Sequence, residues 1–131
     1  MAVLEILTYP DPRLETVAQP VERFDDELRD FIADLEETRL AGPGAVGIAA
    51  PQVGRGLRIV IVDISSKPKH PHHGRLVLVN PEITEWEGVA VGREGCLSVP
   101  DFTGNVIRAE RVALEACDEH GRRSQYSCTG F

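Results

Sequence analysis

The sequence of 131 residues has few cysteines, fewer basic than acidic residues, and no long hydrophobic run. Three cysteines are an odd number and too few for the disulfide framework of a secreted domain. The net charge of −7 argues against nucleic acid or an anionic membrane as the main partner, because phosphate binding requires concentrated positive charge. The first residues lack the basic region of a signal peptide, and the most apolar stretch, residues 59–62, is too short to span a bilayer. These absences predict a cytoplasmic protein.

The remaining composition is that of a globular domain. Hydrophobic residues make up 42% of the chain and charged residues 27%, and no repeat or linker divides it, so we expect one domain over residues 1–131. Cys117 and Cys128 flank a turn-like stretch at residues 118–121. A hairpin there could bring the two thiols together, but two reduced thiols in the core are the preferred interpretation.

Helix signals are concentrated in the first third of the chain. Asp11 followed by Pro12 predicts a short helix that runs to about Ala18. A longer helix is predicted by apolar residues at positions i, i+3, i+4 and i+7, preceded by acidic residues that favour a helix N-terminus. These apolar residues are Leu28, Phe31, Ile32 and Leu35, and Gly42-Pro43-Gly44 ends the helix.

Strand signals follow from residue 57 onward. Runs rich in β-branched residues lie at 57–63, 76–80 and 83–89, separated by Gly, Pro, Ser and His, and the stretch 106–117 alternates as a further strand. A hairpin turn is expected at residues 119–121. Helices first and hairpin-connected strands later predict an α+β fold with largely antiparallel sheets, since parallel sheets require crossover connections, usually helices, between the strands.

The loop at residues 42–52 allows three interpretations. Residues 42–47 match the G-x-G-x-x-G spacing of a dinucleotide-binding loop, but a helix precedes the loop and a strand follows it, which is the wrong context. Read further, Gly47-Ile48-Ala49-Ala50-Pro51-Gln52 places a carboxamide behind small residues, where it can donate an N–H to a carbonyl oxygen. The more common explanation for such residues is a tight connection with Gln52 in solvent.

A second pattern, Glu94-Gly95-Cys96-Leu97-Ser98-Val99, places a thiol in a short turn. A thiolate held in this way can ligate a metal while the backbone N–H of Leu97 binds an oxyanion. The alternative is that Cys96 is a small buried hydrophobic residue, and the residues themselves favour neither interpretation.

Together, the two patterns resemble peptide deformylase, a family of metal-dependent hydrolases that remove the formyl group from the initiator methionine of new proteins. Residues 47–52 are similar to the first motif of the family and residues 94–98 to its second, in the same order. The segments at residues 8–14 and 80–83 and the final Gly130-Phe131 also resemble the family. The resemblance therefore covers essentially the whole chain.

The resemblance implies a role for each site residue. Cys96 would be a metal ligand, and Gln52 and the N–H of Leu97 would bind the formyl oxygen. The backbone near Val46, Gly47 and Gly95 would line the substrate groove, Ile48 would contribute to the pocket for the methionine side chain, and Glu94 would pair with Arg108. The implied metal is Fe²⁺, for which Ni²⁺ or Zn²⁺ can substitute. The implied partners are a formyl-Met peptide and, in addition, the ribosome.

The third motif of the family, H-E-x-x-H, does not occur in the sequence, whose four histidines are His70, His72, His73 and His120. One cysteine cannot hold a catalytic metal that needs about three protein ligands, so the 131 residues alone are predicted to be inactive and to bind no metal. The preferred explanation is a fragment of an ordinary deformylase that is incomplete at its C-terminal end. The alternative is a shortened relative that binds formyl-Met ends or takes metal ligands from a partner chain. In either case we expect an uncovered apolar groove that promotes oligomers.

Overall fold

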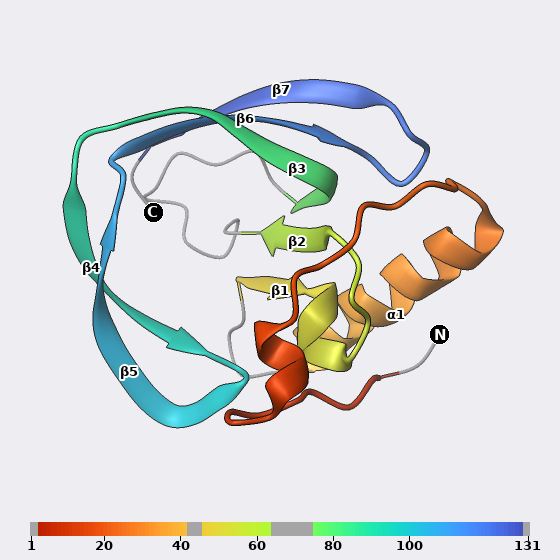
Figure 1. Cartoon of the computed structure of the whole chain (residues 1–131), viewed down its shortest axis with the longest axis horizontal. Coiled ribbons are helices and arrows are strands. Elements are labelled where there is room, and N and C mark those ends of the chain that lie inside the picture. Colours follow the sequence, from red (N-terminus) through yellow and green to blue (C-terminus); the bar gives the residue numbers. More distant parts are fainter. Residues whose placement is uncertain (1–2, 42–45, 64–74, 130–131) are drawn as a thin grey trace.

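The computed structural model describes residues 3–41, 46–63 and 75–129, and Figure 1 shows their arrangement. Short 3-10 helices lie at Pro12–Glu15 (η1) and Ala50–Val53 (η2), and one α-helix, α1, spans Asp26–Ala41. The strands are β1 (Gly47–Ala49), β2 (Ile59–Asp63), β3 (Arg75–Glu87), β4 (Ala90–Cys96), β5 (Val99–Arg108), β6 (Arg111–Cys117) and β7 (Arg123–Thr129). The strands pair antiparallel in two sheets, β1-β2-β3-β6-β7 and β4-β5, which confirms the predicted α+β class.

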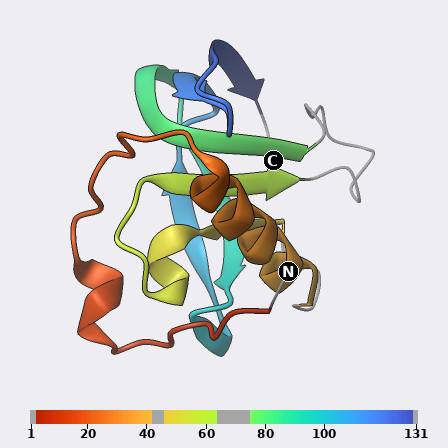
Figure 2. The ribbon, with the colours of Figure 1, turned by 90° about the vertical axis from the view of Figure 1, so that its right-hand side faces the viewer.

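Helix α1 forms where the apolar spacing predicted it. Asp25 caps the helix by accepting a hydrogen bond from the backbone N–H of Leu28 at 3.0 Å. The apolar face packs against residues of β1, β2 and β3, and Figure 2 shows the helix lying beside this part of the larger sheet. The buried cluster comprises Val21, Leu28, Phe31, Ile32, Leu35, Ile48, Ala50, Ile59, Ile61 and Val79. Burial of this face stabilises the helix more than its own propensity does.

The first predicted helix is shorter than expected. Asp11 is its N-cap, but η1 ends at Glu15 instead of near Ala18, because Thr16 has extended backbone angles. The side chain of Asp11 is held by Arg13, whose backbone N and guanidinium both donate to the carboxylate. These hydrogen bonds lower the pKa of Asp11 from 3.8 to about 2.

Two strand boundaries differ from the prediction. The run at 76–80 and residues 83–87 of the next run belong to one strand, β3, whose pairing with β6 shifts register between Val79 and Glu82. Asn80, which has a positive φ of 53°, lies at this irregularity, and its side-chain amide exchanges two hydrogen bonds with the backbone of Val21. The stretch 106–117 is instead divided between β5 and β6, with a break at residues 109–110.

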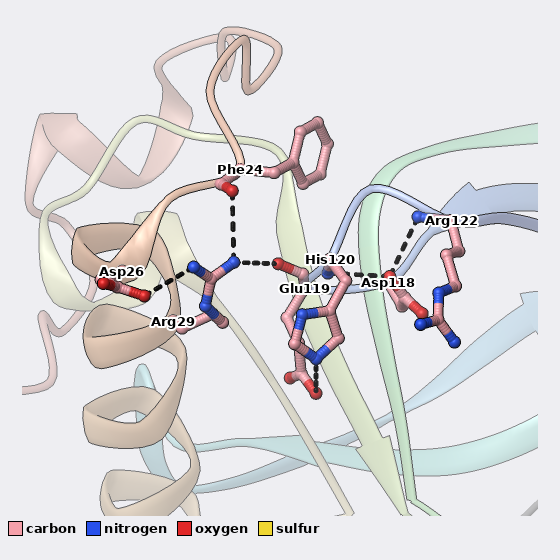
Figure 3. A network of polar contacts seen from close by, with 7 residues as sticks. All are labelled: Phe24, Asp26, Arg29, Asp118, Glu119, His120 and Arg122. Carbon is pink, nitrogen blue, oxygen red and sulfur yellow. Dashed lines mark hydrogen bonds and ion pairs between the residues drawn. The ribbon is translucent and has the colours of Figure 1, made fainter.

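The β6–β7 hairpin is attached to the start of α1 (Figure 3). Arg29 donates to the carbonyl oxygens of Phe24, at 3.2 Å, and Glu119, at 3.5 Å, and pairs with Asp26. The carboxylate of Asp118 closes the turn by accepting from the backbone N–H groups of His120 and Arg122. The predicted turn at residues 119–121 is confirmed.

The same hairpin does not place the two cysteines opposite each other. Cys117 pairs with Arg123, whereas Cys128 pairs with Val112 at the other end of the hairpin. Cys117 is a free thiol, half-buried against the core cluster, which agrees with the preferred interpretation for this residue. In the described part of the chain, no helix has the length and apolar character needed to cross a membrane.

Candidate active site

Gln52 lies in η2, immediately after β1. Its side-chain Oε1 accepts a hydrogen bond from the backbone N–H of Ala49 at 2.9 Å, as a glutamine at the third position of a helix commonly does. Its backbone carbonyl accepts from the N–H of Leu7 at 2.7 Å. The short helix therefore fixes both the backbone and the carboxamide, and Gln52 is half-buried rather than free in solvent.

The orientation of the carboxamide follows from its partners. The N–H of Ala49 can only donate, so the oxygen of the amide must face it. The nitrogen then points the other way, toward Cys96 and Ser98. Nε2 of Gln52 lies 3.5 Å from Sγ of Cys96 and 3.2 Å from Oγ of Ser98.

The second motif forms the tip of the β4–β5 ribbon. Cys96 ends β4 and pairs with Val99, and Leu97 and Ser98 form the turn between them. A register shift separates Gly95 from Cys96. Ser98 is buried, Leu97 packs against the core cluster, and Cys96 is exposed, so the sulfur is accessible to a ligand while its neighbours anchor the turn. The exposed thiol does not fit the interpretation of Cys96 as a core residue.

Glu94 and Arg108 form the predicted pair. Arg108 donates from Nε and Nη2 to the two carboxylate oxygens of Glu94, at 3.0 and 2.8 Å. These hydrogen bonds hold the pKa of Glu94 below its usual value and raise the pKa of Arg108. Both carboxylate oxygens accept from the guanidinium, so the pair connects β4 and β5, the two strands of the ribbon that carries Cys96.

The predicted substrate-contacting residues lie along β1 and at the end of β4. Gly47 pairs with Val62, and an added Cβ at Gly47 would lie 3.3 Å from the carbonyl oxygen of Ile61, so the strand approaches β2 closely. Ile48 is 2% exposed and belongs to the core cluster. Gly95 is exposed next to Cys96. Their contact with substrate remains a prediction.

The histidines do not assemble with Cys96 in the described part of the chain. Those residues contain no group of three His, Cys, Asp or Glu side chains arranged to hold a metal ion. His120 lies in the β6–β7 turn, where Nε2 is 4.0 Å from Oε1 of Glu119. His70, His72 and His73 lie outside the described residues, as do residues 42–45 of the glycine-rich loop and the predicted end of α1.

Sequence reasoning missed two contacts that join the motifs. A serine at this position does not by itself predict a role in the site, yet Ser98 contacts Gln52 directly. In addition, the N-terminal segment bonds to both motifs, with Leu7 donating to Gln52 and Tyr9 donating to the carbonyl of Ser98, each at 2.7 Å. The only sequence signal for this arrangement was that the opening segment belongs to the same resemblance as the two motifs.

Comparison with known proteins defines the class to which this fold and site belong. The family model of polypeptide deformylase matches residues 3–131, which places the protein among the hydrolases. The chain belongs to the peptide deformylase family. It is 46% identical to the peptide deformylase of Alkalilimnicola ehrlichii and 44% identical to that of Neisseria meningitidis, in each case over 100% of the chain and over 71% and 75% of the relative.

Solved structures agree with this assignment. The fold matches a peptide deformylase from Legionella pneumophila with a TM-score of 0.91 and 40% identity, covering 99% of this chain and 74% of that one. It also matches a peptide deformylase from Acinetobacter baumannii, solved with Met-Ala-Ser bound, with a TM-score of 0.90 and 34% identity, covering 99% of this chain and 86% of that one.

Proposed function

We propose that the protein hydrolyses the N-formyl group from peptides that begin with formyl-methionine. The observation that carries the proposal is the contact between the motifs, in which the amide nitrogen of Gln52 lies 3.5 Å from the sulfur of Cys96. The relatives named above are peptide deformylases, and the structure from Acinetobacter baumannii holds a peptide with an N-terminal methionine, the product of such a reaction.

Gln52 and Leu97 are the proposed donors to the formyl oxygen. Hydrolysis of an amide places negative charge on this oxygen in the transition state, and fixed neutral donors stabilise that charge. Nε2 of Gln52 is already directed toward Cys96, and the N–H of Leu97 belongs to the turn that follows this residue. Loss of one such donor typically lowers the rate by ~10²–10³-fold.

The substrate backbone is proposed to lie beside Val46 and Gly47. Among the strands that the structure describes, β1 is at the edge of the larger sheet and pairs with β2 alone. An edge strand can bind an extended peptide, which then forms an additional strand of the sheet. Gly95, exposed at the end of β4, offers a second backbone contact without a side chain in the way.

Cys96 is the proposed metal ligand from this chain. Its exposed sulfur faces the neutral N–H donor of Gln52, which suits a thiolate. When bound, a divalent ion, Fe²⁺ by the family resemblance, would act as a Lewis acid and make a water molecule reactive at neutral pH. The described residues contain no group of three side chains that could hold a metal ion, so a complete site requires further ligands from outside them. Because the sequence of residues 1–131 also contains no H-E-x-x-H motif, we propose that these residues in isolation release no formate.

Formate release tests the proposed reaction. The intact gene product is purified, loaded with Fe²⁺, and assayed with a formyl-Met-Ala-Ser peptide beside a polypeptide of residues 1–131. We expect the intact gene product to release formate, and the polypeptide of residues 1–131 to release none. An intact product that releases no formate under these conditions contradicts the proposed function. Release by the 131 residues contradicts the ligand argument.

A further inference from the structure

Ser98 is a buried polar residue at the turn between Cys96 and Val99. It is 4% exposed, and its hydroxyl oxygen lies 3.2 Å from Nε2 of Gln52. We propose that Ser98 is a positioning residue, which holds the carboxamide of Gln52 in the orientation that donates to the substrate carbonyl. This inference rests on the proposed function for the identity of that carbonyl, but not for the orientation itself.

The carboxamide is held at both ends. The N–H of Ala49 donates to Oε1 at 2.9 Å, and Nε2 donates to Ser98 at 3.2 Å. A rotation of the amide by 180° would place two donors face to face at Ala49 and an oxygen beside the sulfur of Cys96. The Ala49 contact therefore selects which end of the amide faces the backbone, and the Ser98 contact fixes the plane of the amide and the direction of its nitrogen.

The two hydrogens of Nε2 then have separate roles. One is directed to the Ser98 hydroxyl, and the other is directed toward Cys96, where the nitrogen to sulfur distance is 3.5 Å. Sulfur is a weak acceptor, so this hydrogen is the one that can be given up to a carbonyl oxygen bound near the sulfur. Without the Ser98 contact, the amide plane is fixed only through its oxygen.

Ser98 is itself fixed by the backbone. Its carbonyl accepts from the N–H of Tyr9 at 2.7 Å, while Leu7, two residues earlier, donates to the carbonyl of Gln52 at 2.7 Å. The segment at residues 7–9 thus fixes Gln52, the proposed donor to the substrate, relative to Ser98, the residue that orients it. Burial of Ser98 adds to this precision, because a buried hydroxyl has little freedom to exchange its partner for water.

A double-mutant cycle on the active holoenzyme tests the proposal. Ser98→Ala should lower kcat for a formyl-Met peptide about fivefold, with KM little changed, as expected when a hydrogen bond worth about 1 kcal/mol is lost from an orienting contact. In the Gln52→Ala background the same change should cost almost nothing further. Ser124→Ala, on exposed strand β7, is the matched control and should leave kcat unchanged. An equal loss with and without Gln52, or no loss at all, overturns the proposal.

A second measurement does not depend on activity. In ¹⁵N-labelled protein without metal, the two Nε2 protons of Gln52 should have well-separated shifts, and one should show a nuclear Overhauser effect to the β-protons of Ser98. In Ser98→Ala the separation should shrink, while the amide of Gln125 stays unchanged. Absence of the Overhauser effect in the unsubstituted protein overturns the proposal even if the variant fails to fold. Its presence in a protein that releases no formate preserves the positioning role and rejects the proposed reaction.

Discussion

The amide nitrogen of Gln52 lies 3.5 Å from the sulfur of Cys96, although 44 positions separate the two residues in sequence. Strand β1 and helix η2 bring the first residue to this point, and the tip of the β4–β5 ribbon brings the second. The N-terminal segment bonds to the carbonyl of Gln52 through Leu7 and to the carbonyl of Ser98, two residues after Cys96, through Tyr9. The site is therefore assembled by three segments that are distant in sequence, and each of them can be tested separately.

Cys96 should be the more reactive of the two thiols that the structure describes. Its side chain is exposed, whereas Cys117 is half-buried against the core cluster. Alkylation of the folded protein with iodoacetamide, followed by peptide mass mapping, should modify Cys96 at least several-fold faster. Equal rates would contradict the placement of Cys96 at an accessible tip. In the control variant Cys96→Ser, the faster alkylation should disappear.

The Glu94 and Arg108 pair should contribute little to global stability despite its two hydrogen bonds. Both side chains are largely exposed, and solvent-exposed pairs are worth about 0.2–1 kcal/mol. A double-mutant cycle with Glu94→Ala and Arg108→Ala, read by urea unfolding, should give a coupling below about 1 kcal/mol that shrinks in high salt. A coupling of several kcal/mol would contradict this account.

The same pair has a defined pH dependence. Arg108 holds the pKa of Glu94 below its usual 4.5, so the folded state binds this proton more weakly than the unfolded state. The stabilising contribution is therefore complete above about pH 4.5 and is lost as the pH falls through the lowered value. In NMR titrations, Arg108→Ala should move the pKa of Glu94 upward, toward 4.5. An unchanged pKa would contradict the assignment of Arg108 as its cause.

Gly121 should resist substitution more than Gly104. Gly121 has a φ of 84°, and an added Cβ would lie 3.3 Å from the ring of Phe24, whereas an added Cβ at Gly104 meets nothing within 4 Å. We expect Gly121→Ala to lower the free energy of unfolding by about 1–2 kcal/mol, since both backbone strain and a close contact oppose it. Gly104→Ala should change it by less than about 0.5 kcal/mol. Equal effects in denaturant unfolding would contradict the hairpin geometry.

Large apolar side chains on β3, β4 and β5 should promote self-association. Ile83, Trp86, Val91 and Ile107 are each more than 60% exposed, and the last two lie directly opposite each other in the ribbon. Light scattering should show a mass that rises with the concentration of the 131-residue polypeptide, and Trp86→Glu should reduce the rise. A monomer at all concentrations would contradict this expectation.

Local pattern was sufficient for much of the fold. The spacing of Leu28 to Leu35 predicts α1 because one helix face must be apolar, and the two motifs contain the residues that meet at the site. The division of 106–117 was missed because alternation continues across the break at residues 109–110. The unity of β3 was missed because Asn80 has the appearance of a turn residue, and only the pairing of β3 with β6 on both sides of Asn80 shows that the strand continues. The contact of Ser98 with Gln52 is a hydrogen bond between residues far apart in sequence, and no periodic pattern in the sequence predicts such a contact.

We propose that Gln52 donates a hydrogen bond to the reacting carbonyl oxygen. The most direct measurement compares kcat/KM for release of formate from a formyl-Met peptide by the metal-loaded intact protein, by Gln52→Ala and by Gln125→Ala. Gln125 is a matched glutamine on β7 that donates to Glu115 at 2.7 Å. The account predicts a loss of about 10²-fold or more for Gln52→Ala and no loss for Gln125→Ala. Equal activity of the two variants would contradict it.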